Sequence, residues 1–320
     1  MNAIEIENLS HYYQTGVLRK HLVRALDSIT LHVSKGEVFG FLGPNGAGKT
    51  TTFKILMRLI KPSSGVARIL GRPLDDMQMR ARIGYMPEQP FFYDYLTARE
   101  FLTYAGTLCD LSYRETKMRM KDLLYQVGLT DVADRRLRKF SKGMLQRIGL
   151  AQALINDPTV LFLDEPMSGL DPLGRREVRD LIASLRTRGK TIFFSSHILT
   201  DVEAMCDRVA ILDHGRMVEY GRISEILRSR STEIEVVVSG VTEERLSDWW
   251  EHGIRYFPTP EGARVRLKSD REIGRLMEII HKAGGRLVSI NPVRESLEDL
   301  FVREVTSNSQ ETEQGSYNPD

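Results

Sequence analysis

The chain has 320 residues, of which 45 are basic (Lys or Arg) and 43 are acidic (Asp or Glu), so its formal net charge is +2. This balance gives no electrostatic sign of a nucleic-acid binder or of a partner for acidic proteins. The length suits one large and one small domain. The two distant cysteines indicate a reducing compartment. No apolar run reaches the ~20 residues that span a bilayer, so we expect any membrane role to pass through a partner chain.

Residues 3 to about 230 alternate short β-branched runs with amphipathic helical patterns, which is typical of an α/β domain. The runs at residues 160–163 and 192–194 are apolar throughout. Such runs indicate strands that are buried on both faces of a mostly parallel sheet. The predicted strands cover residues 4–7, 29–33, 38–42, 83–86, 160–163, 191–195 and 209–212.

A glycine-rich run, GPNGAGKTT, occupies residues 43–51, between the predicted strand at 38–42 and a helical pattern that begins near Lys49. A loop in this context is typical of a P-loop, whose backbone N–H groups cradle phosphates beside the positive end of the helix. We expect Lys49 to reach the β- and γ-phosphates and Thr50 to ligate Mg²⁺. A glycine-rich turn without a ligand would not require that lysine and hydroxyl.

Residues 88–156 are predicted to form a helical subdomain inserted into the α/β core. Thr97 with Glu100, and Ser112 with Glu115, have the spacing of capping boxes, which mark helix starts. One apolar helix face is predicted from the spacing of Met120, Leu123, Leu124 and Val127.

The run FSKGMLQ at residues 140–146 opens a further amphipathic helix. Ser141 is a candidate N-cap, and together with Gly143 and the helix N-terminus it predicts an anion site. A plain N-cap is the alternative. Asp171, which precedes Pro172, has the residue types of an N-cap and first helical position as well.

Two of the predicted buried strands end in side chains that can carry chemistry. The run VLFLDE ends in Asp164 and Glu165, whose side chains point to different places because directions alternate along a strand. One carboxylate can hold the shell of a magnesium ion while the other reaches an attacking water. An ordinary polar strand exit is the alternative. His197 follows the strand at 191–195 and can hydrogen-bond a γ-phosphate or a water.

The pattern changes after about Arg230. Strands are predicted at residues 233–239, near Tyr256, at 263–267 and at 286–290, and helices at 243–250, 270–283 and 295–305. This β-α-β-β-α-β order with a tail helix is compatible with a small ferredoxin-like domain over residues 231–305. Residues 306–320 are polar and are predicted to be disordered.

The motifs GPNGAGKTT, FSKGM, VLFLDEP, SGLD and SSH, in this order, are similar to those of the ATP-binding subunit of an ABC transporter, over residues 3 to about 230. The resemblance implies an α/β fold of the P-loop NTPase class. Residues 1–230 would form the ABC ATP-binding core, with its mostly parallel sheet and inserted helical subdomain. The small α+β C-terminal domain and its ending SLEDLF, residues 296–301, resemble those of ABC-2-type exporter ATPases.

The resemblance also implies a role for each matching residue. Glu165 would be the general base, His197 the switch histidine, and Tyr13 the aromatic that stacks on adenine, with adjacent Tyr12 as the alternative. The other implied ATP-binding residues are Gly43, Pro44, Asn45, Gly46, Ala47, Gly48, Lys49, Thr50 and Thr51. The implied contacts to the ATP of a second cassette are Ser141, Lys142, Gly143 and Asp171. The implied Mg²⁺ ligands are Thr50, Asp164, Gln89 and Glu88.

Two departures from the family pattern bear on these roles. The family signature usually reads LSGGQ, but here Lys142 replaces a glycine and Met144 the glutamine. Lys142 adds positive charge beside a phosphate site, so we expect ATP sensing to survive. In the run IGYMPEQ, Glu88 stands after the proline where the family has a glutamine, and Gln89 comes next. Both residues therefore stay open as the contact to magnesium and water.

The resemblance implies a function. Two cassettes, identical or near twins, would close over ATP and Mg²⁺, and hydrolysis would drive a separate transmembrane permease, as an exporter, at the cytoplasmic face of the cell membrane. Residues 91–95, FFYDY, would dock the permease or fill the subdomain core. No nucleic-acid partner is expected. The cargo and the role of the C-terminal domain are not readable from these residues.

A soluble ABC ATPase in DNA or ribosome-linked work is the alternative. Chromosome-type members carry long coiled coils between the two Walker motifs, but here that stretch lacks sustained heptads. Ribosome-associated members carry two cassettes on one chain, and this sequence has one GxxxxGKT run. Both observations favour the transporter.

Overall fold

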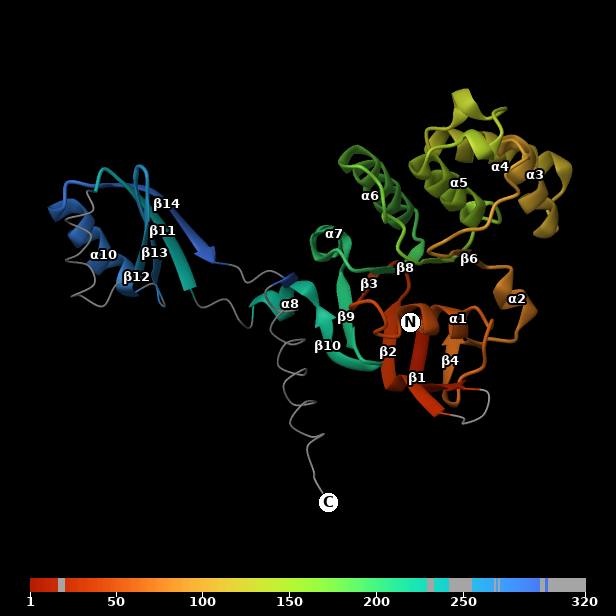
Figure 1. Cartoon of the computed structure of the whole chain (residues 1–320), viewed down its shortest axis with the longest axis horizontal. Coiled ribbons are helices and arrows are strands. Elements are labelled where there is room, and N and C mark those ends of the chain that lie inside the picture. Colours follow the sequence, from red (N-terminus) through yellow and green to blue (C-terminus); the bar gives the residue numbers. More distant parts are fainter. Residues whose placement is uncertain are drawn as a thin grey trace, which may run out of the picture. The chain divides into compact units, whose positions relative to one another are not determined.

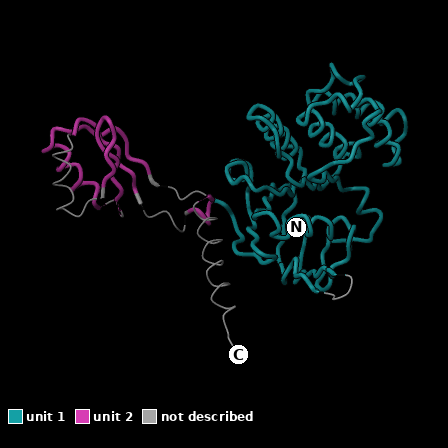
Figure 2. The backbone as a smooth tube through the Cα atoms, in the orientation of Figure 1, with its two compact units in different colours: residues 1–223, 307–320 teal, residues 224–306 magenta. Residues whose placement is uncertain are grey.

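The computed structural model of the chain describes residues 1–16, 21–228, 233–241, 255–267, 269, 271–293 and 297–298. Two compact units, distinguished by colour in Figure 2, contain them. The first spans residues 1–223 and the second lies within residues 224–306. The predicted helix at 243–250 and the predicted tail at 306–320 lie outside the described residues, as does most of the predicted helix at 295–305.

A six-stranded sheet forms the centre of the first unit (Figure 1). Its strands are β3 (Val38–Leu42), β6 (Ile83–Met86), β7 (Val160–Leu163), β8 (Thr191–Ser196), β9 (Arg208–Asp213) and β10 (Arg216–Arg222). Their spatial order is β10-β9-β3-β8-β7-β6, and every neighbouring pair is parallel except β9 with β10. The predicted mostly parallel sheet is confirmed.

The apolar runs explain why these strands are central. Every residue of β3, β7 and β8 is buried. Phe39 of β3 stacks on Phe193 of β8 with ring centroids 5.5 Å apart, and Phe53 of α1 (Lys49–Leu56) lies 5.3 Å from Phe193. Parallel strands place their carboxyl ends along one edge of the sheet, so the loops after β3, β7 and β8 meet there.

A second sheet of the first unit is antiparallel. It contains β1 (Asn2–Thr15), β2 (His21–Ser34), β4 (Ser64–Ile69) and β5 (Arg72–Pro73), in the order β2-β1-β4-β5. The sequence predicted only one segment of each strand, residues 4–7 near the start of β1 and 29–33 near the end of β2, and did not separate them from the parallel sheet. The reason is that apolar alternation is regular only there, and register shifts interrupt the pairing beyond Ile6.

The predicted helical subdomain contains α3 (Ala98–Leu108), α4 (Tyr113–Gln126) and α5 (Lys142–Leu154), with short 3₁₀ turns η1 (Thr130–Val132) and η2 (Leu137–Lys139). Figure 1 shows the three helices grouped together. Both predicted capping boxes are present, at the starts of α3 and α4. The predicted apolar face of residues 120, 123, 124 and 127 is buried.

The remaining helices of this part of the chain are α2 (Met77–Arg80), α6 (Pro172–Thr187), α7 (Leu199–Met205) and α8 (Ile223–Arg228). Helix α6 begins as predicted, because the Asp171 carboxylate accepts a hydrogen bond from Gly174 N–H at 2.9 Å and Pro172 follows the cap. The sequence analysis did not predict α8. Across the described residues, no helix combines the length and the apolar character needed to cross a bilayer.

The second unit contains β11 (Glu233–Ser239), β12 (Arg255–Thr259), β13 (Gly262–Leu267), α10 (Arg271–Lys282) and β14 (Arg286–Val293). The strands form an antiparallel sheet in the order β12-β13-β11-β14. Leu276 and Ile280 of α10 pack in one core with Val236, Val238 and Val265 of the sheet. This strand order is the one that a ferredoxin-like arrangement requires.

Candidate active site

The loop at residues 43–51 joins β3 to the N-terminus of α1. Gly46 and Gly48 have φ of +85° and +107°, values that favour glycine. A Cβ on Gly48 would lie 2.6 Å from the Ala25 carbonyl oxygen, so no larger residue fits there. Gly48 caps α1 without a side chain, so no capping side chain accepts a hydrogen bond from the first N–H groups of the helix. Uncapped N–H groups at a helix N-terminus, where the helix dipole is positive, form an anion site.

The Lys49 ammonium is held within this loop. Its Nζ donates hydrogen bonds to the carbonyl oxygens of Gly43, at 2.6 Å, and of Pro44, at 3.2 Å. It also lies 3.8 Å from Glu165 Oε1. Burial lowers the pKa of Lys49, and the neighbouring charges of Glu165 and Asp164 oppose that shift. The cation therefore sits where phosphate oxygens would meet the loop.

Asp164 directly follows β7 and is buried. Its Oδ1 accepts a hydrogen bond from Ser195 Oγ at 2.6 Å, whereas its Oδ2 has no hydrogen-bond partner within the described residues. Burial raises the pKa of Asp164 more than the nearby hydroxyls of Ser195 and Thr50 lower it. A buried carboxylate oxygen beside a threonine hydroxyl matches the oxygen ligands that Mg²⁺ prefers.

Glu165 adopts a left-handed backbone conformation, with φ of +51°. Its N–H donates to Ser195 Oγ at 2.9 Å, and its Oε2 lies 2.8 Å from His197 Nδ1. Its Oε1 is buried, and no described residue forms a hydrogen bond with it. One carboxylate oxygen is thus fixed by the histidine while the other faces Lys49. A carboxylate oriented in this way can accept a proton from a water.

Lys49, Glu165 and His197 lie at a cavity of about 440 Å³, whose lining residues do not include Asp164. Its lining consists of Pro44, Asn45, Gly46, Gly48, Lys49, Thr50, Thr51, Glu88, Glu165, Ser168 and His197. Of the two candidates that follow Pro87, Glu88 lines the cavity and Gln89 is not among its lining residues. Burial, together with the Asp164 charge, raises the pKa of Tyr85 to about 12, so this phenol stays neutral.

Tyr13 lies beside the cavity. Its hydroxyl is 3.4 Å from Thr51 Oγ1, and its ring forms an edge-to-face pair with the His11 ring, with centroids 4.6 Å apart. Tyr12 is 41% exposed, and its N–H donates to Ser63 Oγ at 3.1 Å. Tyr13 is therefore the ring that adjoins the loop.

The other predicted phosphate contacts do not line this cavity. Ser141 Oγ accepts a hydrogen bond from Met144 N–H at 3.3 Å and caps α5, and Asp171 caps α6. A Cβ on Gly169 would collide with the Lys142 ammonium, so the Lys142 side chain lies against the loop that precedes Asp171. The glycine-rich loop and the capped N-terminus of α5 thus lie at two different places of the chain.

The sequence analysis missed three residues of this arrangement. It assigned Ser195 only to a strand end, yet Ser195 joins Asp164 to the Glu165 backbone. Ser168 lines the cavity. Gln146, buried on α5, donates to the carbonyl oxygens of Glu165 and Pro166. A polar residue inside an otherwise apolar helix face was the available signal for Gln146.

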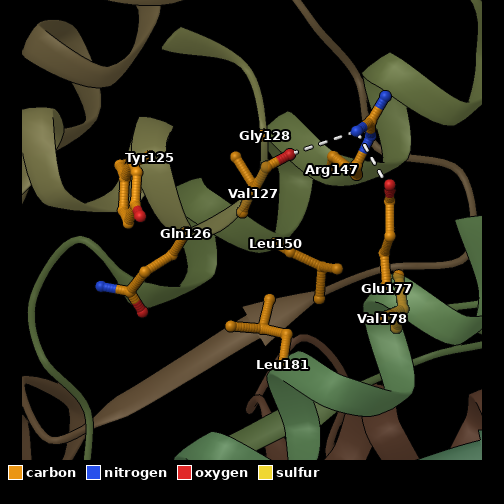
Figure 3. Close-up of a pocket in the computed structure, with 9 residues that line it drawn as sticks. All are labelled: Tyr125, Gln126, Val127, Gly128, Arg147, Leu150, Glu177, Val178 and Leu181. Carbon is orange, nitrogen blue, oxygen red and sulfur yellow. Dashed lines mark hydrogen bonds and ion pairs between the residues drawn. The ribbon is translucent and has the colours of Figure 1, made fainter.

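A second cavity, of about 180 Å³, lies where the end of α4, α5 and α6 meet (Figure 3). Leu150, Val178 and Leu181 provide apolar walls. Arg147 of α5 donates to the Val127 carbonyl oxygen at 3.4 Å and pairs with Glu177 of α6 at 3.1 Å. This ion pair connects α5 to α6 beside the cavity.

Comparisons with known proteins place this site in a family context. A family model described as "ABC transporter" matches residues 26–168. An uncharacterised ABC transporter ATP-binding protein of Synechocystis is 45% identical over 306 residues, which cover 95% of this chain and 85% of that protein. The bacitracin transport ATP-binding protein BcrA of Bacillus licheniformis is 35% identical over 284 residues, 88% of this chain and 92% of its own. A solved ATP-binding subunit of an ABC transporter is 33% identical, with a TM-score of 0.63 over 71% of this chain and 92% of that one.

Proposed function

The chain belongs to the ABC transporter family, as an ATP-binding subunit that hydrolyses ATP, and from this we propose that it powers export through a separate membrane permease at the cytoplasmic face of the membrane. The observation that carries the proposal is the buried group of Lys49, Asp164 and Glu165 beside the glycine-rich loop, with His197 on Glu165. Relatives that match along most of their length are named as transporter subunits, which favours transport over soluble DNA or ribosome-linked work.

ATP would bind with its phosphates on the N–H groups of residues 43–51 and on Lys49, and with adenine on Tyr13. Thr50 and Asp164 would hold Mg²⁺, and Glu88, which lines the cavity, would be a further ligand. The ion, when bound, supplies positive charge to the phosphates being separated. We assign this position to Glu88 rather than Gln89 because Glu88 lines the cavity.

Glu165 would accept the proton of the attacking water. The His197 ring holds Oε2 at 2.8 Å, so Oε1 is left to the water. A general base of this kind contributes about 10²–10⁴-fold to the rate. Because Glu165 is fixed before ATP arrives, little reorganisation is needed at the moment of reaction.

The second anion-binding end, at residues 141–143 with Asp171, lies outside the cavity of its own chain. We assign it to the ATP bound by a second copy, since each copy carries both the loop and the helix end that the other requires. Two copies would therefore enclose two ATP molecules. ATP favours this closed pair because it bridges the two surfaces, and hydrolysis removes the bridge, so the nucleotide shifts the population between closed and open states.

An exposed aromatic cluster (Phe91, Tyr93, Tyr95 and Tyr104) supports a docking site for the permease. Phe91 is 84% exposed, and the ring of Tyr93 contacts the rings of the other three at centroid distances of 5.6–6.0 Å. Exposed aromatic rings are typical anchors of protein interfaces. Phe92 differs, because it packs on Phe101 of α3 with centroids 5.2 Å apart. The run FFYDY thus serves both the surface and the core.

The test is reconstitution of the chain with the permease encoded beside its gene, in sealed vesicles that expose the cassette to added ATP. We expect ATP hydrolysis to accompany movement of cargo to the side opposite the cassette. Hydrolysis without any membrane partner that binds the chain would contradict the transport proposal. Cargo movement toward the cassette would contradict export alone.

A further inference from the structure

The backbone of Glu165 is held in a conformation that non-glycine residues rarely adopt, with φ of +51°. Such a residue persists only when its surroundings fix it. The direction of the Glu165 carboxylate depends on this backbone, because the turn after β7 sets where the side chain points. The contacts that hold the turn therefore determine the direction of the Glu165 carboxylate.

Two buried side chains hold the peptide groups on either side of Glu165. Ser195 Oγ accepts from Glu165 N–H at 2.9 Å. Gln146 Nε2 donates to the carbonyl oxygen of Glu165 at 3.2 Å and to that of Pro166 at 2.9 Å. Gln146 is only 5% exposed. Its amide thus uses both donor hydrogens on two consecutive carbonyls, which leaves little freedom to the turn.

Gln146 belongs to α5, whose N-terminus carries residues 141–143. The same helix is joined to the segment after β7 at further points. The Lys142 side chain lies against Gly169, and Arg147 pairs with Glu177 of α6 at 3.1 Å (Figure 3). A displacement of the N-terminus of α5 would therefore also displace the turn that carries Glu165.

We propose that Gln146 is a positioning residue, which fixes the turn that carries Glu165. Through this turn, the position of the helix end at residues 141–143 would determine the direction of the Glu165 carboxylate. This inference rests on the proposed role of Glu165. It explains why an amide donor is buried in a helix whose neighbouring positions Ile148, Leu150 and Ala151 are apolar. When a second copy engages residues 141–143, α5 would transmit that engagement to Glu165.

The test is Gln146→Met in the full chain, because methionine has nearly the same length and shape but donates no hydrogen bond. The matched control is Gln152→Met, on the same helix and half-buried. We expect the kcat of ATP hydrolysis to fall about 10- to 100-fold in Gln146→Met, because a small misplacement of a catalytic group costs about that much. The Kd for ATP, measured with a fluorescent ATP analogue, should stay within twofold, and Gln152→Met should match the parent chain.

A merely structural role of Gln146 would change both kcat and the affinity for ATP. If Gln146→Met lowers kcat and weakens ATP binding in the same proportion, the residue supports the whole site and the inference is wrong. Unchanged kcat in a folded Gln146→Met chain overturns it as well. Glu165→Gln, measured alongside, separates the two proposals: if that variant hydrolyses ATP at the parent rate, the role of Glu165 fails, and if only Gln146→Met is fully active, the positioning role fails alone.

Discussion

The nucleotide cavity and the signature loop (residues 141–143) are built in opposite ways. Around the cavity, Lys49, Asp164 and Glu165 are at most 7% exposed and are held by hydrogen bonds and ion pairs within one chain. At the signature loop, Ser141 and Lys142 are exposed, and Ser141 Oγ accepts one bond from its own helix. The contacts of the first region thus lie within one chain, whereas the second region exposes side chains that we propose contact the ATP of another copy.

The largest expected effect comes from the buried region. Lys49→Ala should raise the Kd for ATP by about 100-fold, since charge-assisted hydrogen bonds are worth roughly 1.5–3 kcal/mol each. Lys54→Ala, an exposed lysine of the same helix, is the control and should bind like the parent chain. Equilibrium binding of a fluorescent ATP analogue measures both. Equal affinity of the two variants would show that the loop binds without its lysine.

A charge at the signature loop should separate hydrolysis from binding. Gly143→Asp has room for its Cβ, which would make ordinary contact with Leu170. Its carboxylate should repel the triphosphate of the second copy and lower kcat by about 100-fold, while the ATP affinity of the single chain stays within twofold. Gly274→Asp, at an open helical position of the second unit, is the control. A large loss of ATP affinity in Gly143→Asp would contradict the division into two regions.

The aromatic cluster offers a comparison between surface and core within one run. Phe91→Ala combined with Tyr104→Ala should reduce recovery of the permease in pull-downs by more than about tenfold, because interface aromatics contribute about 1–2 kcal/mol or more each. The double variant should leave basal ATPase activity unchanged. Tyr113→Ala, also exposed, is the control. Phe92→Ala should instead lower the free energy of unfolding by about 2 kcal/mol, measured by denaturant titration. Normal permease recovery in the double variant would rule out this docking site.

The smallest effect concerns pH. Burial raises the pKa of Asp164 above the ordinary aspartate value of about 4, so the charged form destabilises the fold at pH 7. This penalty is fully present above the raised pKa and shrinks as pH falls toward the unfolded value. Asp164→Asn, which keeps an acceptor for Ser195, should therefore raise the Tm at pH 7 by a few degrees, for about 1 kcal/mol. Its advantage should shrink in acid, and a lower Tm at pH 7 would contradict the argument.

The sequence predicted those parts of the structure that local patterns determine. Strand, glycine loop and helix at residues 38–56 needed only apolar runs and the residues that turns and helix ends require. The caps at Thr97 and Ser112 followed from residue spacing, and the cap at Asp171 followed from the proline after it. The second sheet of β1 and β2 was not separated, because strand pairing across bulges depends on contacts between distant residues.

The same limit applies to the site. Motif order selected the candidate residues, but it did not predict which side chains hold them in place. The bond from Ser195 to Asp164 spans 31 positions, and those from Gln146 to the Glu165 turn span 19 and 20. No local pattern encodes such contacts. Likewise, the choice between Glu88 and Gln89 depends on which side chain faces the cavity.

The most direct test of the central claim, that two copies complete each other's ATP sites, is the mass of the Glu165→Gln chain in sedimentation velocity. This variant should bind ATP without hydrolysing it. We expect twice the 36.5 kDa chain mass with ATP and Mg²⁺, and the single mass without nucleotide or when Gly143→Asp is added. A single mass with ATP bound, or a pair that persists with Gly143→Asp, would contradict the account.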